Sequence, residues 1–293
     1  MTESEATRLR RWFPARTPSG LRPFEAELAI AARAVVRGGE AAMRLYRLGS
    51  LAVTDKAVDD PVTEADHASN EQILDCLRLH RPFDPVVSEE VPAPPASSAK
   101  RLWLVDPLDG TKEFIAANGE FSVMVGLAID GWAALGAVFQ PDLDLLFLGV
   151  ADVGAYVVEG ASKDGRARPL RIEGRPVERL RLVRSRSHPD PRLRSLEESL
   201  GEVDTVRSGS VGIKCALIAL GRADLYVHPV PHLKEWDTCA PEAILRGAGG
   251  RVTDCLGRPL SYAKADPRQP GGIFAAREDV WHRVAHLVAT VAP

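Results

Sequence analysis

Residues 103–111 have the sequence WLVDPLDGT, in which an apolar run of strand type meets two carboxylates, Asp106 and Asp109. The proline and the glycine within it are turn-forming residues, so the chain changes direction there. Two acids at the end of a buried strand repel each other unless a positive charge lies between them. Magnesium meets that need because it binds oxygen ligands, and the Leu108 carbonyl offers a further one. The alternative interpretation is an aspartate-rich turn that caps the next helix.

Further acidic residues stand at predicted element ends far away in the sequence. Glu89 and Glu90 close an apolar segment, Asp237 lies just ahead of a predicted helix, and Asp66 follows Thr63 by three positions. Taken singly, the two glutamates are typical of solvated surface, and Asp237 is typical of a helix N-cap. Thr63 and Asp66 are typical of a capping box. Together, carboxylates at distant element ends indicate an active site assembled on an α/β scaffold.

The hydrophobic pattern around these segments predicts a first part that is rich in strands and a second part in which strands alternate with helices. In the first part we expect helices at 24–48, 64–80 and 111–117, and strands at 85–88, 101–106, 121–129, 132–139, 143–150 and 155–158. After a polar junction at 159–176, we expect strands at 180–185, 224–228, 251–253 and 272–275, and helices at 191–200, 211–220, 238–246 and the C-terminus. This order predicts an α/β (α+β) fold.

The size and charge of the chain limit its organisation and its partners. It has 293 residues, 45% of them hydrophobic, and a formal net charge of -3. We expect a loose N-terminal extension at 1–22, a metal-binding α+β domain at 23–160 and a substrate-binding α/β domain at 161–293. The charge does not favour a nucleic-acid polymer as partner. No apolar run approaches the ~20 residues of a membrane helix.

The cysteines and the N-terminal sequence predict a location. The chain has four cysteines, Cys76, Cys215, Cys239 and Cys255. Their spacing does not predict a zinc site, and scattered cysteines are typical of buried thiols in a reducing compartment. The first residues lack the apolar core of a signal peptide. We therefore expect a cytoplasmic protein without a membrane segment.

Four segments, in this order, resemble the motifs of the inositol monophosphatase superfamily. They are DPVTEAD at 60–66, SEE at 88–90, WLVDPLDGTKEF at 103–114 and EWDTCAPEAILRGAGG at 235–250. The resemblance implies a five-layer α/β/α/β/α sandwich of the inositol monophosphatase and fructose bisphosphatase type. The variants DPLDGTKEF and EWDTCAPE are more similar to the 3'(2'),5'-bisphosphate nucleotidase branch, of the CysQ type.

The resemblance also implies a metal site and a way to activate water. Two or three magnesium ions would be held by Glu89, Asp106, the Leu108 carbonyl, Asp109 and Asp237. Thr111 with Asp66 resembles the water-activating pair of the family, and Glu90 would orient the water or support the metal ligands. Lys56 matches a family lysine near the third metal, although a solvated surface lysine is an equal alternative.

Other residues are candidates for binding the phosphorylated substrate. The backbone N–H groups of Gly110 and Thr111 open a helix and suit a phosphate oxygen. Two segments, SRSH and GSVGIK, resemble nucleotide-binding segments and supply Ser185, His188, Ser210 and Lys214. We expect Lys214 to pair with a retained 5'-phosphate, near the start of the helix at 211–220. A structural role is the alternative for His188.

The resemblance implies a magnesium-dependent, lithium-sensitive phosphatase of sulfur metabolism. The predicted reaction is hydrolysis of the 3'-phosphate of 3'-phosphoadenosine 5'-phosphate to AMP and phosphate, by attack of a metal-activated water. The first alternative is a phosphatase for inositol phosphates or for sugar phosphates such as fructose 1,6-bisphosphate. The second is a catalytically silent nucleotide-binding protein. Such a protein has usually lost at least one metal ligand of the family, whereas this sequence retains all of them and the Thr111/Asp66 pair. A monomer and a homodimer are both open.

Overall fold

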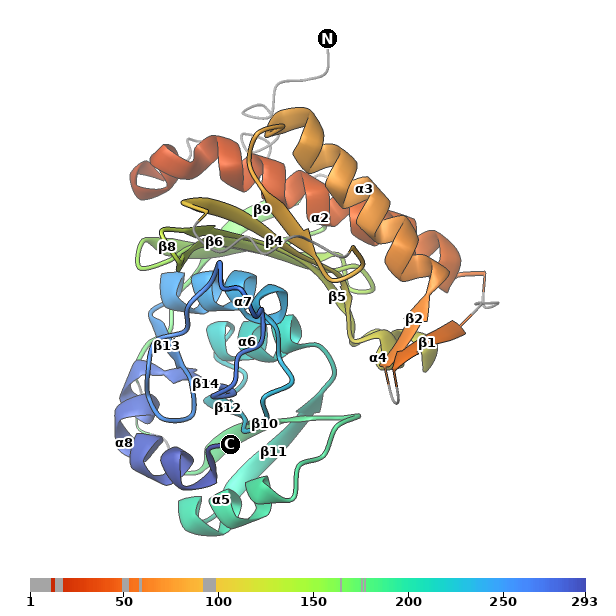
Figure 1. The fold of residues 1–293 in the computed structure, drawn as a ribbon. Helices are drawn as coiled ribbons and strands as arrows, with labels where there is room; N and C mark the ends of the chain where they lie inside the picture. The colour runs from red at the N-terminus through yellow and green to blue at the C-terminus, as the bar shows by residue number, and fades with distance from the viewer. Residues whose placement is uncertain are drawn as a thin grey trace.

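Five layers make up the molecule, as Figure 1 shows. The computed structural model describes residues 12–13, 18–48, 53–57, 60–91, 99–163, 165–174, 176 and 178–293, without the side chains of 53–57 and 60–62. The outer layer on one side consists of helices α2 (Glu25–Tyr46) and α3 (Glu64–His80). The middle layer consists of α6 (Val211–Ala219) and α7 (Glu235–Gly247). The outer layer on the other side consists of α5 (Arg192–Leu200) and α8 (Glu278–Val288). One sheet lies on each side of the middle helices. The predicted five-layer sandwich is confirmed.

The first sheet has seven strands in sequence order. They are β3 (Val86–Ser88), β4 (Arg101–Asp109), β5 (Ser122–Ile129), β6 (Trp132–Gln140), β7 (Leu145–Val150), β8 (Gly154–Glu159) and β9 (Arg166–Leu170). Only β3 and β4 pair in parallel. The central strands are buried on both faces, which explains their nearly continuous apolar sequences. Strand β9 lies in the segment predicted as a polar junction, so this sheet extends past residue 160.

The second sheet has five strands in the order β11-β10-β12-β14-β13. Their bounds are β10 (Leu180–Ser185), β11 (Val203–Ser208), β12 (Leu225–His228), β13 (Gly250–Thr253) and β14 (Ile273–Arg277). Strand β10 is parallel to both of its neighbours. The carboxyl ends of these parallel strands therefore meet at one edge, where α/β sheets commonly bind ligands.

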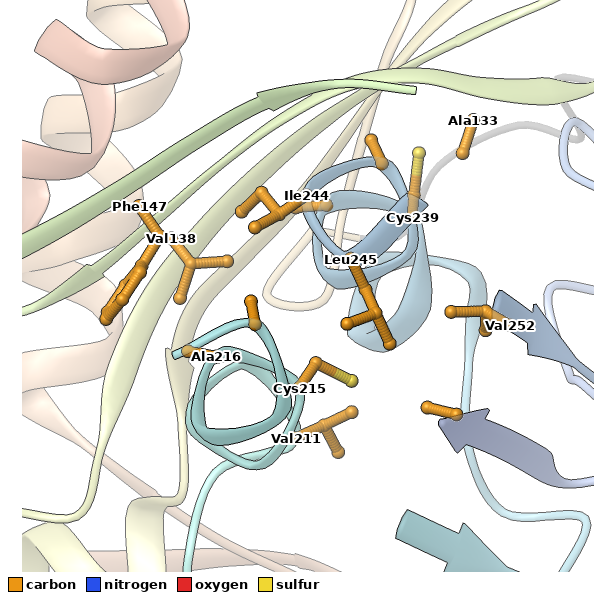
Figure 2. Close-up of a cluster of buried hydrophobic side chains, with 14 of the residues drawn as sticks. Ala133, Val138, Phe147, Val211, Cys215, Ala216, Cys239, Ile244, Leu245 and Val252 are labelled. Atoms are coloured by element: carbon orange, nitrogen blue, oxygen red, sulfur yellow. The ribbon is translucent and has the colours of Figure 1, made fainter. Parts of the chain in front are cut away.

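The middle helices are apolar on both sides because each lies between two sheets. Figure 2 shows Ile244 and Leu245 of α7 beside Cys215 and Ala216 of α6, with Phe147 of the first sheet nearby. Helix α7 comes so close to the first sheet that a Cβ at Gly136 would lie 2.3 Å from the Ala240 carbonyl oxygen. Glycine is therefore required where the helix crosses the sheet. The predicted buried thiols are confirmed, since all four cysteines are buried.

Several local predictions differ from the structure. The hairpin of β1 (Val53–Ala57) and β2 (Asp60–Thr63) and the strands β9 and β11 were not predicted. Helix α4 (Thr111–Ile115) is shorter than expected, and the short 3-10 helices η1 (Ser19–Phe24) and η2 (Ala289–Val291) flank the fold. The expected loose extension is partly packed, because Trp12, Phe13 and Leu21 are buried in the core beside α2. Within the described residues, no helix is long and apolar enough to cross a membrane.

Candidate active site

A pocket of about 870 Å³ lies between the two sheets and receives side chains from both. One end is acidic and is lined by Glu89, Asp106, Asp109 and Asp237. The other end is basic and aromatic and is lined by His188, Lys214, Tyr226, His228, His232 and Trp236. The residues predicted at distant points of the sequence are thus gathered at one place.

An irregularity in β4 places Asp106 and Asp109 on the same side of the sheet. Their partners on β5 are Met124 and Ser122, which are two residues apart, whereas the aspartates are three apart. Residues three apart in a regular strand face opposite sides, and one extra residue in the strand reverses the second of them. The chain then turns at Gly110, whose φ of 97° is favourable only for glycine.

The other two carboxylates reach this corner from neighbouring elements. Strand β3 runs parallel to β4, with Ser88 opposite Val105, so the next residue, Glu89, arrives beside Asp106. Its N–H donates to the Val105 carbonyl at 3.1 Å. Asp237 lies in the first turn of α7 and accepts from the Lys234 N–H at 2.7 Å. The N-cap residue is Lys234 and not Asp237, because α7 begins at Glu235, but Asp237 still accepts the N–H of that N-cap residue.

The electrostatics of the corner disfavour four ionised carboxylates without a compensating positive charge. Burial raises the pKa of Asp106 well above its usual range, and the neighbouring acids Glu89, Asp109 and Asp237 raise it further. Burial, and then the charge of Glu89, also raises the pKa of Asp237 well above its usual range. Carboxyl groups in one buried site either keep a proton or stay ionised beside a positive charge, and a bound cation supplies that charge.

The residues present fit a hard divalent cation, since every donor at the corner is an oxygen. Among the described residues, no three acidic, histidine or cysteine side chains form a finished ligand group as they stand. Oδ2 of Asp109 and Oδ2 of Asp237 accept hydrogen bonds from the protein, and these bonds fix the orientation of both carboxylates.

Asp66 contacts both its own helix and the corner. Its Oδ2 accepts from the Thr63 N–H at 2.8 Å and from the Thr63 hydroxyl at 2.7 Å, which is the predicted capping box. Its Oδ1 accepts from the Thr111 hydroxyl at 3.2 Å. The Thr111 hydroxyl also lies 3.1 Å from the Leu108 carbonyl. Capping and pairing with Thr111 therefore use different oxygens of one carboxylate.

The N-terminus of α6 binds an anion of the protein itself. Oδ2 of Asp109 accepts from the Ser210 hydroxyl at 2.5 Å and from the Gly212 N–H at 3.0 Å. Ser210 is 1% exposed and also caps α6 by accepting from the Ile213 N–H at 3.1 Å. The sequence predicts that this helix terminus and Ser210 contact the substrate. In the structure their donors bind Asp109, because the helix begins directly beside the corner.

Lys214 is the buried cation of the pocket, with 3% of its surface exposed. Its Nζ donates to the Gly209 carbonyl and lies 5.3 Å from the centre of the Tyr226 ring. Burial lowers the pKa of Lys214, whereas the nearby charges of Asp109 and Glu113 raise it. Lys214 is therefore the residue of the basic end that lies nearest to the acidic corner.

The remaining predicted residues have different placements. Ser185 and His188 both line the pocket, and the Ser185 hydroxyl accepts from the His188 N–H at 3.1 Å. Glu90 is not among the described residues that line the pocket, and its carboxylate is 3.9 Å from His67 of α3. Lys56 lies on β1, and its side chain is outside the described part of the molecule.

His228 is a pocket residue that the sequence analysis missed. It ends β12, and burial together with the charge of Lys214 lowers the pKa of its imidazole to about 3. The ring is therefore neutral near pH 7. A polar residue at the carboxyl end of a predicted strand, in the segment LYVHPVPH, was the available signal.

An acidic corner that suits a cation, facing a buried lysine across one pocket, is the arrangement of a hydrolase for phosphate esters. Comparisons with known proteins agree with this class. The model of the inositol monophosphatase family matches residues 25–291. The CysQ 3'(2'),5'-bisphosphate nucleotidase of Escherichia coli K12 is 40% identical over 230 residues, which are 76% of this chain and 89% of the relative.

Solved structures agree as well. The crystal structure of CysQ from Bacteroides thetaiotaomicron is 30% identical, with a TM-score of 0.73, and the match covers 86% of this chain and 97% of that chain. The suhB protein of Bartonella henselae is 25% identical, with a TM-score of 0.77 and coverage of 90% and 98%. The chain belongs to the inositol monophosphatase family, and it is a phosphatase similar to the bisphosphate nucleotidases.

Proposed function

We propose that the protein is a magnesium-dependent phosphatase that removes the 3'-phosphate of 3'-phosphoadenosine 5'-phosphate, leaving AMP and phosphate. The observation that carries the proposal is that one pocket joins four carboxylates to a buried lysine. The carboxylates suit the cations of a phosphatase, and the lysine suits an anion that stays on the product. A substrate with two phosphate groups uses both features.

The acidic corner provides the ligands for magnesium. Two or three ions would be held by Glu89, Asp106, the Leu108 carbonyl, Asp109 and Asp237. Bound magnesium supplies charge neutralisation at the phosphate and lowers the pKa of a water molecule. The geometry of β4 supports this assignment, because its extra residue brings Asp106 and Asp109 to the same side.

Thr111 and Asp66 orient the attacking water. Because the Thr111 hydroxyl donates its proton to Asp66, its oxygen can accept a hydrogen bond from water. As the water attacks, its proton passes to the Thr111 oxygen and the Thr111 hydroxyl proton passes to Asp66, which acts as the general base. The backbone at Gly110 and Thr111 faces the pocket and suits the phosphate oxygens.

The basic end of the pocket binds the rest of the substrate. Lys214 pairs with the retained 5'-phosphate, and the neutral His228 together with Tyr226 and Trp236 provides surfaces for an adenosine group. Similarity to the CysQ bisphosphate nucleotidases supports a nucleotide over a sugar phosphate.

A phosphate-release assay tests the proposal. Three substrates are compared, each with and without magnesium: 3'-phosphoadenosine 5'-phosphate, inositol 1-phosphate and fructose 1,6-bisphosphate. We expect magnesium-dependent turnover, with kcat/KM at least about tenfold higher for the nucleotide, which corresponds to about 1.4 kcal/mol. A preference for inositol 1-phosphate or fructose 1,6-bisphosphate would refute the proposed substrate. Turnover that persists in a chelator would refute the magnesium assignment.

A further inference from the structure

One wall of the pocket is formed by residues 186–190, here called the wall segment. It follows the end of β10 in the second sheet, and Ser187, His188, Pro189 and Asp190 line the pocket. The acidic corner belongs to the first sheet. The distance between this wall and the corner therefore depends on how the two sheets are connected at this edge.

Two side-chain contacts connect the wall segment to the first sheet. Arg186 forms a two-pronged ion pair with Glu120: Nε donates to Oε2 at 2.7 Å, and NH2 donates to Oε1 at 2.6 Å. The neighbouring Ser187 hydroxyl donates to Oε1 of Glu113. Glu113 lies on α4 and Glu120 lies just before β5. Each contact therefore connects the wall segment, which follows a strand of the second sheet, to the chain between two strands of the first sheet, β4 and β5.

The backbone around these contacts is closely packed. The Ser210 N–H donates to the Glu120 carbonyl at 3.1 Å, and a Cβ at Gly209 would lie 2.4 Å from the same oxygen. Arg186 is also held to β11, because its N–H donates to the Ser208 carbonyl at 3.1 Å and its guanidinium to the Arg207 carbonyl at 3.2 Å. The guanidinium thus joins β11, the wall segment and Glu120.

We propose that Arg186 and Glu120 are positioning residues that hold the wall segment at the distance from the acidic corner required by a nucleotide. The proposal rests on the proposed function. Neither residue is among the described pocket-lining residues, so both act through Ser187 and His188. A planar guanidinium that binds both oxygens of a carboxylate fixes orientation as well as distance. The side chains are 42% and 24% exposed, so the pair adds little to the stability of the fold.

Three variants test the pair: Arg186→Ala, Glu120→Gln, and the charge swap Glu120→Arg with Arg186→Glu. Arg179→Ala is the matched control, because Arg179 forms an exposed ion pair with Glu202 on the second sheet, away from the pocket lining. The measurements are calorimetric binding of AMP, hydrolysis of 4-nitrophenyl phosphate with magnesium, and amide hydrogen exchange of residues 186–190. The first and third do not depend on turnover.

In the two single variants, the amide hydrogens of the wall segment should exchange faster. AMP should bind about three- to fivefold more weakly, as expected for a partly exposed ion pair. The kcat for 4-nitrophenyl phosphate should stay within about twofold, because its single phosphate needs only the residues that we assign to the acidic corner. The charge swap should recover most of the AMP affinity, and the control should match the wild type.

Unchanged amide exchange in both single variants would overturn the positioning role. Faster exchange with unchanged AMP affinity would also overturn it. The same holds if the variants lose 4-nitrophenyl phosphate turnover by the same factor as AMP affinity. A wild-type protein that binds no AMP but hydrolyses other phosphate esters would instead refute the nucleotide substrate. In that case the exchange measurement alone decides whether the pair holds the wall segment.

Discussion

Ser210 donates its hydroxyl proton to the carboxylate of Asp109 at 2.5 Å, although 101 positions separate the two residues in the chain. The same hydroxyl accepts from the Ile213 N–H, so one side chain both caps α6 and fixes an acid of the first sheet. The Ser122 hydroxyl of β5 lies 2.7 Å from it. The two sheets are therefore joined at a residue that we assign to the metal site.

Replacing Ser210 by alanine should weaken magnesium binding. Asp109 would keep its bond to the Gly212 N–H but lose the shorter one, so its orientation would be less well fixed. Residues that orient metal ligands typically change metal affinity or activity by about 10- to 100-fold. A magnesium titration of phosphate release measures the shift. Ser195→Ala, on the exposed side of α5, is the control, and equal titrations for both variants would contradict the assignment.

Removing the Thr111 hydroxyl should slow the chemical step. Thr111→Val keeps the shape of the side chain but cannot donate to Asp66, and we expect kcat to fall about 10²- to 10⁴-fold. Thr111→Ser keeps a hydroxyl and should retain much of the activity. Steady-state kinetics at saturating magnesium and substrate distinguish the two variants. A valine variant as active as the serine variant would show that the hydroxyl does not orient the water.

Replacing Lys214 by methionine should affect a substrate with two phosphates more than one with a single phosphate. Methionine fills the buried space but has no charge to pair with a retained phosphate. Because hydrogen bonds to charged groups contribute about 1.5–3 kcal/mol, KM for 3'-phosphoadenosine 5'-phosphate should rise at least about tenfold. KM for inositol 1-phosphate should change much less. Lys163→Met, at an exposed turn, is the control, and equal changes for both substrates would place the lysine outside the nucleotide site.

Glu242 of α7 should make the stability of the protein depend on pH. It is 2% exposed, it accepts from the Tyr262 hydroxyl at 2.6 Å, and burial raises its pKa from 4.5 to about 7. The folded state therefore keeps the proton that the unfolded state loses. The contribution of this group to stability is complete below about pH 4.5 and is lost as the pH rises towards 7.

The variant Glu242→Gln removes that titration. Relative to this variant, the free energy of unfolding of the wild type should fall between about pH 4.5 and 7, by no more than roughly 3 kcal/mol. Denaturant unfolding at several pH values measures the difference. Parallel curves for the two proteins would mean that Glu242 titrates normally.

Short-range patterns in the sequence were sufficient for much of the fold. Helix α3 has the predicted bounds of 64–80, and β10 has those of 180–185. The strands β9 and β11 were missed because both lie at sheet edges, where exposed polar residues interrupt the apolar pattern. The hairpin of β1 and β2 was missed for lack of any apolar alternation.

The sequence by itself determined the residue types of the site and the family, because carboxylates, turn residues and their order along the chain are local properties. The tertiary structure alone decided which atoms meet. It showed that an extra residue in β4 turns Asp109 to the side of Asp106, that α6 directs its Gly212 N–H at Asp109, and that His228 reaches the pocket. These relations depend on strand register and on the packing of two sheets around shared helices, and both arise from contacts between residues that are far apart in the sequence.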